Sequence, residues 1–211
     1  MEVKTTRPTG IIKPLPTLIF PMAEEATRTF TGGGASRPRL AAELASAAVE
    51  VRNTGANSIG PGYLWTARRT FPLLGQTLPE RQVGDLISAI NMLEQNEHFP
   101  LQSVAIFGDS RMAPIAIYAG MLSTQVDEIV LRDCPRTHED PTVAEFLGVL
   151  RVGDLPHNLA LAYPRAITFV GKVPDEFRWT KRVYEKLGAA DRIRQIDSIS
   201  QWRPFPAVAT R

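Results

Sequence analysis

A serine follows a short apolar run near the middle of the chain, in the segment VAIFGDSRMA at 104–113. The run predicts a buried strand, the Gly-Asp-Ser step predicts a tight turn, and Pro114 suits the first turn of a helix. A G-x-S-x-G nucleophile elbow works in this context: the turn exposes the Ser oxygen and aims the next N–H at a developing oxyanion. Ser110 is therefore the candidate nucleophile for acyl transfer, although Met112 stands where the motif has its second glycine.

The general base that such a serine needs is not in its usual place. A Ser hydroxyl stays protonated and weakly nucleophilic at neutral pH without one. On a scaffold with this elbow the chain order is Ser, acid, His, yet the histidines are His98, His138 and His157. His157 is the best substitute, because Asp154 three residues earlier could orient its imidazole. The competing interpretation is a loop or helix-start histidine without chemistry.

Composition predicts an ordinary globular protein. Its 211 residues suit one domain over 1–211, and residues 1–16, with three prolines, predict an extended lead-in. The chain is 44% apolar and 22% charged, with a net charge of +2 and scattered basic residues, so no nucleic-acid partner is expected. No apolar run reaches the roughly 18 residues that span a bilayer. No secretory signal stands at the N-terminus, so we expect no membrane partner and a cytoplasmic location.

Apolar runs and helical periodicity alternate along the chain. Strands are predicted at 17–20, 49–52, 103–107, 128–131, 167–170 and 192–196. Helices are predicted at 39–48, 81–97, 114–122, 142–150 and 175–187, with loops at 24–38 and 53–63. This alternation predicts an α/β fold, with a mostly parallel sheet of about six strands, helices on both faces and a minimal lid. Ligands of such sheets bind beyond the carboxyl ends of the strands, where the elbow lies.

With these features in place, the chain resembles the α/β-hydrolase superfamily. It is most similar to the branch of acetyl xylan esterases and dienelactone hydrolases. The resemblance covers about residues 15–200 and rests on the segments 17–22, 49–55, 104–113, 155–166 and 167–170. It implies a carboxylic-ester hydrolase that acts on a small or carbohydrate-linked ester.

The resemblance also implies a role for individual positions. It makes Ser110 the nucleophile and Asp175, after the strand at 167–170, the acid. The oxyanion hole would combine the N–H of Arg111 with one N–H from the turn at Met22 and Ala23. The base would follow the last strand, where Ser198, Ile199, Ser200, Gln201 and Trp202 stand instead.

Two functions therefore remain open from the sequence. One is a degenerate ester hydrolase in which Ser110 works with a noncanonical base. The other is a non-catalytic protein that binds a ligand or a partner in the same cleft.

No cofactor and no metal are expected, because no His, Cys or carboxylate cluster has ligand spacing and Gly32-Gly33-Gly34 is not a dinucleotide fingerprint. The Gly-Asp-Ser block with Asp154 and His157 also resembles GDSL-type hydrolases, in which that block stands near the chain start.

Overall fold

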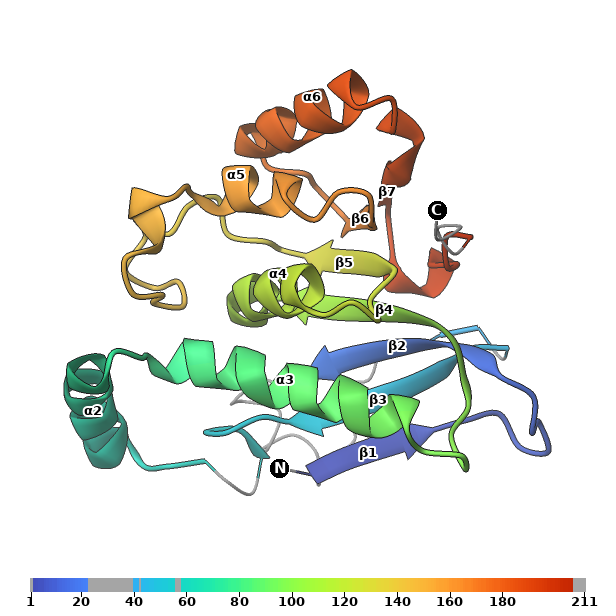
Figure 1. Ribbon diagram of the computed structural model, residues 1–211, viewed down its shortest axis with the longest axis horizontal. Coiled ribbons are helices and arrows are strands. Elements are labelled where there is room, and N and C mark those ends of the chain that lie inside the picture. The colour runs from blue at the N-terminus through green and yellow to red at the C-terminus, as the bar shows by residue number, and fades with distance from the viewer. Residues whose placement is uncertain (1, 23–39, 42, 56–57, 207–211) are drawn as a thin grey trace.

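The centre of the fold is a seven-stranded sheet in the order β1-β3-β2-β4-β5-β6-β7 (Figure 1). The computed structural model describes residues 2–22, 40, 41, 43–55 and 58–206. Its strands are β1 (Glu2–Thr6), β2 (Leu15–Pro21), β3 (Ala45–Glu50), β4 (Leu101–Asp109), β5 (Glu128–Arg132), β6 (Ala166–Val170) and β7 (Ile193–Ile196). Strand β1 pairs antiparallel with β3, and every other pairing is parallel. The predicted mostly parallel α/β sheet is confirmed.

Among the described residues, four helices pack on one face of this sheet. The described helices are α2 (Pro61–Thr70), α3 (Leu78–Glu94), α4 (Ala113–Leu122), α5 (Leu155–Ala160) and α6 (Arg178–Lys186). The short 3-10 helices are η2 (Phe71–Leu74), η3 (Ser110–Met112), η4 (Val149–Arg151), η5 (Asp175–Phe177), η6 (Ala190–Arg192) and η7 (Ile199–Gln201). Helices α3 to α6 cover the sheet, whereas α2 lies beyond its end, on the side to which β2 and β5 point (Figure 1). None of the described helices is long and apolar enough to cross a membrane.

Strand residues alternate between two apolar cores, as the period of a pleated strand requires. One core lies between the sheet and helices α3 to α6 and includes Ile106, Ile115 and Phe169. The other core lies on the opposite face and includes Phe107 and Trp202. Within the described residues, this second face is covered by Leu40, Ala41 and Leu44 and by Ile199 and Trp202 after β7. Both faces of the central strands are thus buried, which explains their continuous apolar runs.

Two predicted helices are not formed. The segment 39–48 is rich in Ala and Leu and is therefore predicted to be helical, but Ala45–Glu50 is strand β3, inserted between β1 and β2. Tertiary pairing overrides the helix propensity of alanine there. The segment 142–150 forms turns and only begins η4, after Gly148 at φ +69°. Asp140 holds this turn by accepting the N–H and the hydroxyl of Thr142 at 2.8 and 2.7 Å.

Two elements were not anticipated. Strand β1 forms inside the predicted lead-in, and Lys4 on it pairs with the buried Glu50 at 2.7 Å. Helix α2 begins at Pro61, inside the predicted loop at 53–63, and continues beyond it to Thr70. Gly60 is its N-cap. That Gly-Pro step is the sequence signal that could have found it. The predicted loop at 24–38 lies outside the described residues.

The buried carboxylate of Glu128 accepts hydrogen bonds from the segment that follows β7. Glu128, the first residue of β5, is 1% exposed. Its Oε1 accepts hydrogen bonds from the Thr168 hydroxyl at 2.5 Å, from Arg194 at 3.0 Å and from the Trp202 indole at 3.0 Å. Its Oε2 accepts the N–H of Phe205 at 3.1 Å. These bonds hold the C-terminal segment at the amino edge of the sheet, opposite to the elbow.

Candidate active site

Ser110 lies in the predicted turn between a strand and a helix. Strand β4 ends at Asp109, Ser110 opens η3, and α4 follows from Ala113. The φ angle of Ser110 is +49°, in the left-handed region that residues other than glycine adopt uncommonly. Such conformations cost about 1–3 kcal/mol and cluster at functional sites. The backbone therefore has the strained turn of a nucleophile elbow.

Gly108 lets the strand approach the helix closely. A Cβ added to Gly108 would lie 2.6 Å from Ala113 Cα and 2.6 Å from Ala116 Cβ, which is closer than real Cβ contacts. Only glycine fits this position, which explains the first glycine of the motif. Met112, at the position of the second glycine, is 7% exposed and packs in the core under the helices. The elbow accommodates this side chain by burying it.

The Ser110 hydroxyl has a charged neighbour. Its Oγ donates to Asp109 Oδ1 at 3.1 Å. Arg132 Nε donates to the same Oδ1 at 3.0 Å, and Arg132 Nη2 binds Oδ2. Arg132 ends β5 directly opposite Asp109, and its guanidinium carbon lies 5.4 Å from the centre of the Phe107 ring. The hydrogen bond to Asp109 raises the pKa of Arg132. A chain of polar contacts thus joins Ser110, Asp109 and Arg132.

His157 is separate from this chain of contacts. It is exposed on α5, and its ring packs against Trp179 with 5.1 Å between ring centres. Asp154 does not orient its imidazole, because the carboxylate caps α5 and accepts the N–H groups of Leu155 and His138, each at 2.7 Å. In the described part of the chain, the hydrogen bond of the Ser110 hydroxyl goes to Asp109 and not to a histidine.

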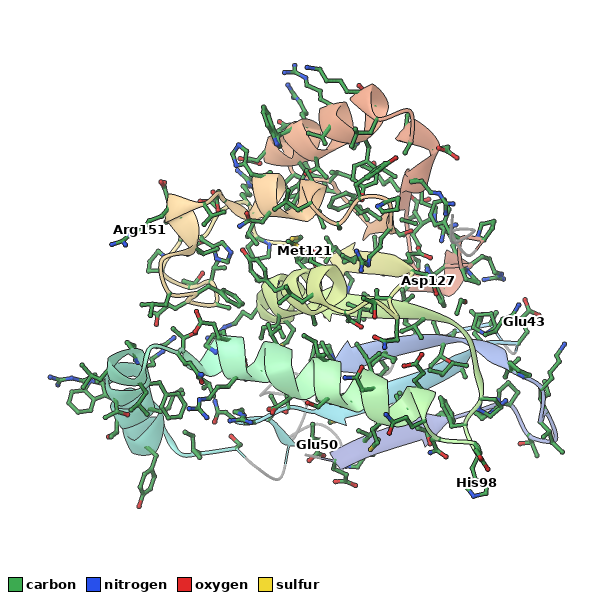
Figure 2. The ribbon with its side chains drawn as sticks, viewed as in Figure 1. Glu43, Glu50, His98, Met121, Asp127 and Arg151 are labelled. Atoms are coloured by element: carbon green, nitrogen blue, oxygen red, sulfur yellow. The ribbon has the colours of Figure 1, made fainter. Side chains whose placement is uncertain are left out.

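The other two histidines have different surroundings. His138 Nε2 hydrogen-bonds to the Tyr118 hydroxyl at 2.8 Å, and burial lowers the pKa of His138. Tyr118 also accepts a hydrogen bond from Asn158 at 2.9 Å, and burial raises its pKa to about 12. His98 is exposed between α3 and β4, at the edge where β4 begins (Figure 2). Neither ring is bonded to the elbow.

The position predicted for the acid carries an exposed ion pair. Asp175 opens η5, and its carboxylate binds Arg178 at 2.9 Å. That hydrogen bond lowers the pKa of Asp175. The position predicted for the base is occupied by η7 and by the fully buried Trp202. The described residues therefore hold no Ser–His–acid hydrogen-bond chain.

The candidates for the oxyanion hole differ in availability. The Met22 N–H donates to the carbonyl of Val49 at 2.9 Å, so this donor is already engaged. Ala23 lies outside the described residues. Arg111 is exposed next to Ser110 in η3. Among the residues that the structure places, no three His, Cys, Asp or Glu side chains gather as a metal site.

Solved structures similar to this chain include acetyl xylan esterases and glucuronoyl esterases. A Bacteroides fragilis protein assigned as an acetyl xylan esterase is 16% identical, with a TM-score of 0.70 over 92% of this chain and 61% of its own. The catalytic domain of a Hypocrea jecorina glucuronoyl esterase is 15% identical, with a TM-score of 0.61 over 97% and 66%. The acetyl xylan esterase from Paenibacillus sp. R4 is 14% identical, with a TM-score of 0.55 over 92% and 71%. The chain has the α/β-hydrolase fold.

The predicted resemblance to α/β-hydrolases, and to acetyl xylan esterases among them, is confirmed at the level of the fold. No protein-family model matches the sequence, and no curated protein does. This α/β-hydrolase-fold chain spans 61%, 68% and 66% of the lengths of three similar structures.

Proposed function

We propose that this protein is a carboxylic-ester hydrolase of low activity that uses Ser110 as its nucleophile on a small or carbohydrate-linked ester. The observation that carries the proposal is the left-handed backbone of Ser110, at φ +49°. A strained turn persists only where the surrounding structure enforces it, and Gly108 and α4 enforce it here. The hydroxyl is exposed at the carboxyl edge of the sheet, where ligands of such folds bind.

The substrate class follows from the similar structures. Two are acetyl xylan esterases by name, and another, a Sporotrichum thermophile glucuronoyl esterase, was solved with methyl 4-O-methyl-β-D-glucopyranuronate. An ester on a sugar is therefore the first class to test. Turnover should be slow, because triad members act as a unit and removing one costs several powers of ten in rate.

A second candidate function is ligand binding without catalysis. The observation that favours it is the hydrogen bond of Ser110 to Asp109, a carboxylate already engaged by Arg132, where an active triad would have a histidine. A protein of this kind would bind an ester or sugar at the same edge of the sheet, beside Ser110, without cleaving it.

Hydrolysis of p-nitrophenyl acetate distinguishes the two functions. We expect slow release of p-nitrophenol by the wild-type protein and only background release by Ser110→Ala. Ser88→Ala is the matched control, because Ser88 is an exposed serine on α3 whose hydroxyl donates to the carbonyl of Gly84 at 2.8 Å. His157→Ala should keep the wild-type rate. Equal rates in the wild type and Ser110→Ala would refute the hydrolase and leave ligand binding.

A further inference from the structure

The carboxylate beside Ser110 has the geometry of a proton acceptor. A general base must lie about 2.6–3.2 Å from the atom that it deprotonates. Asp109 Oδ1 lies 3.1 Å from Ser110 Oγ, and the hydroxyl donates to it. This contact already meets the distance requirement, whereas neither His138 nor His157 bonds to Ser110 within the described residues.

Arg132 holds that carboxylate in place. Its Nε donates to Oδ1 at 3.0 Å and its Nη2 binds Oδ2, so the guanidinium grips both oxygens. A two-pronged pair of this kind fixes orientation as well as position. The side chains of Asp109 and Arg132 remain 36% and 40% exposed, so a substrate and water can reach them. In a histidine triad, a carboxylate orients the base; here an arginine orients a carboxylate.

We propose that Asp109 is the general base of Ser110 and that Arg132 is its positioning residue. This inference rests on the proposed hydrolase function and identifies its missing base. The Ser110 Oγ–C bond forms at the ester carbonyl carbon while the hydroxyl proton moves to Asp109 Oδ1. The C–O bond to the leaving alcohol then breaks, and Asp109 returns the proton to that oxygen. Water repeats the sequence on the acyl-enzyme, which releases the carboxylic acid and restores Ser110.

The chemical type of the base also explains why the activity should be low. Carboxylates are weaker proton acceptors than imidazoles, since the reference pKa values are about 3.9 for Asp and about 6.5 for His. Among the residues that the structure describes, charged groups close by include Asp133, whose charge acts on Arg132, and Arg111, which follows Ser110 in the chain. In this arrangement a weaker base, a carboxylate held in one orientation by Arg132, takes the place of the stronger imidazole base.

Acylation under single-turnover conditions, with protein in excess over p-nitrophenyl acetate, measures the step directly. General-base catalysis typically contributes 10²–10⁴-fold. We therefore expect Asp109→Asn, which keeps an acceptor oxygen, to slow acylation about 100-fold or more. Asp85→Asn is the matched control, because Asp85 on α3 forms the same kind of two-pronged pair with Arg52, at 2.7 and 2.9 Å, and is not bonded to Ser110. It should leave acylation unchanged.

Two further measurements distinguish a general base at Asp109 from a residue that only supports the structure. Added formate should restore acylation in Asp109→Ala, since it supplies a carboxylate to the vacated space, and this test stands even if Asp109→Asn is unstable. The wild-type rate should also lack the acid limb near pH 6.5 that a histidine base produces.

The outcomes are distinct. Normal acylation by Asp109→Asn with loss in Ser110→Ala would overturn the base assignment and keep the hydrolase. The base assignment is also overturned if formate restores nothing, or if an acid limb is present in the wild type and disappears in His157→Gln. Equal acylation by Ser110→Ala and the wild type would overturn both.

Discussion

The backbone of Ser110 predicts the sign of a stability difference between two substitutions. Ser110→Ala and Ser110→Gly both remove the hydroxyl and its bond to Asp109, so they differ in their tolerance of φ +49° and in the freedom of the unfolded chain. The left-handed conformation costs an L-residue about 1–2 kcal/mol. Glycine avoids that cost but loses about 0.5–1 kcal/mol through its more flexible unfolded chain. With the middle of each range, we therefore expect Ser110→Gly to be more stable than Ser110→Ala by about 0.75 kcal/mol.

Thermal and urea unfolding of the two variants measure this difference. In a protein of this size 1 kcal/mol shifts Tm by about 2–4 °C, so the expected gap is ~1–4 °C in favour of glycine. A Ser110 in ordinary helical geometry would give the opposite order, because glycine is about 1 kcal/mol worse than alanine in a helix. A lower Tm for Ser110→Gly would therefore refute the elbow. The matched pair Ser88→Ala and Ser88→Gly, on α3, should show that opposite order.

Three further predictions concern the surrounding structure. Gly108→Ala should cost about 1–3 kcal/mol in urea unfolding, because its Cβ meets the backbone of Ala113; unchanged stability would show that the strand and helix are not in contact. Glu128→Ala should cost about 3–5 kcal/mol by leaving Arg194 and its neighbours without their buried acceptor, and Glu128→Gln should cost less; equal losses would exclude a role for the charge. Burial lowers the pKa of His138, so the unfolded state takes up the proton first and stability should fall as pH drops below about 6.5. His138→Gln should flatten that part of the stability profile, and an unaltered slope would contradict the assignment.

The strands around the elbow could be predicted because their signals are local. The apolar runs of β4, β5 and β6 are short, continuous and bounded by polar residues, as strands buried on both faces require. The elbow could be predicted for the same reason, since the Gly108-Asp109-Ser110 step directly follows the apolar run of β4. The polarity pattern of 81–97 similarly predicted most of α3, although its start at Leu78 depends on the capping box between Thr77 and Glu80.

The features that sequence reasoning missed depend on pairing between distant segments. Residues 45–48 of strand β3 were predicted to be helical and the strand was expected only at 49–52, because alanine favours helices and the pairing with β1 and β2 imposes the extended form. The contact between Asp109 and Arg132 depends on the register of β4 against β5. A signal did exist, since each residue ends an apolar run and the ends of parallel strands meet at one edge. Reading those two positions together would have suggested a carboxylate held beside Ser110.

Covalent trapping tests the central claim most directly. The protein is mixed with p-nitrophenyl acetate, quenched in acid and digested, and the peptide that contains Ser110 is examined by mass spectrometry. The proposed function predicts an acetyl group on Ser110 that forms in the wild type and Ser88→Ala and is absent from the corresponding peptide of Ser110→Ala. An unmodified Ser110 in the wild type, with acetyl groups only on surface lysines, would contradict a nucleophilic role.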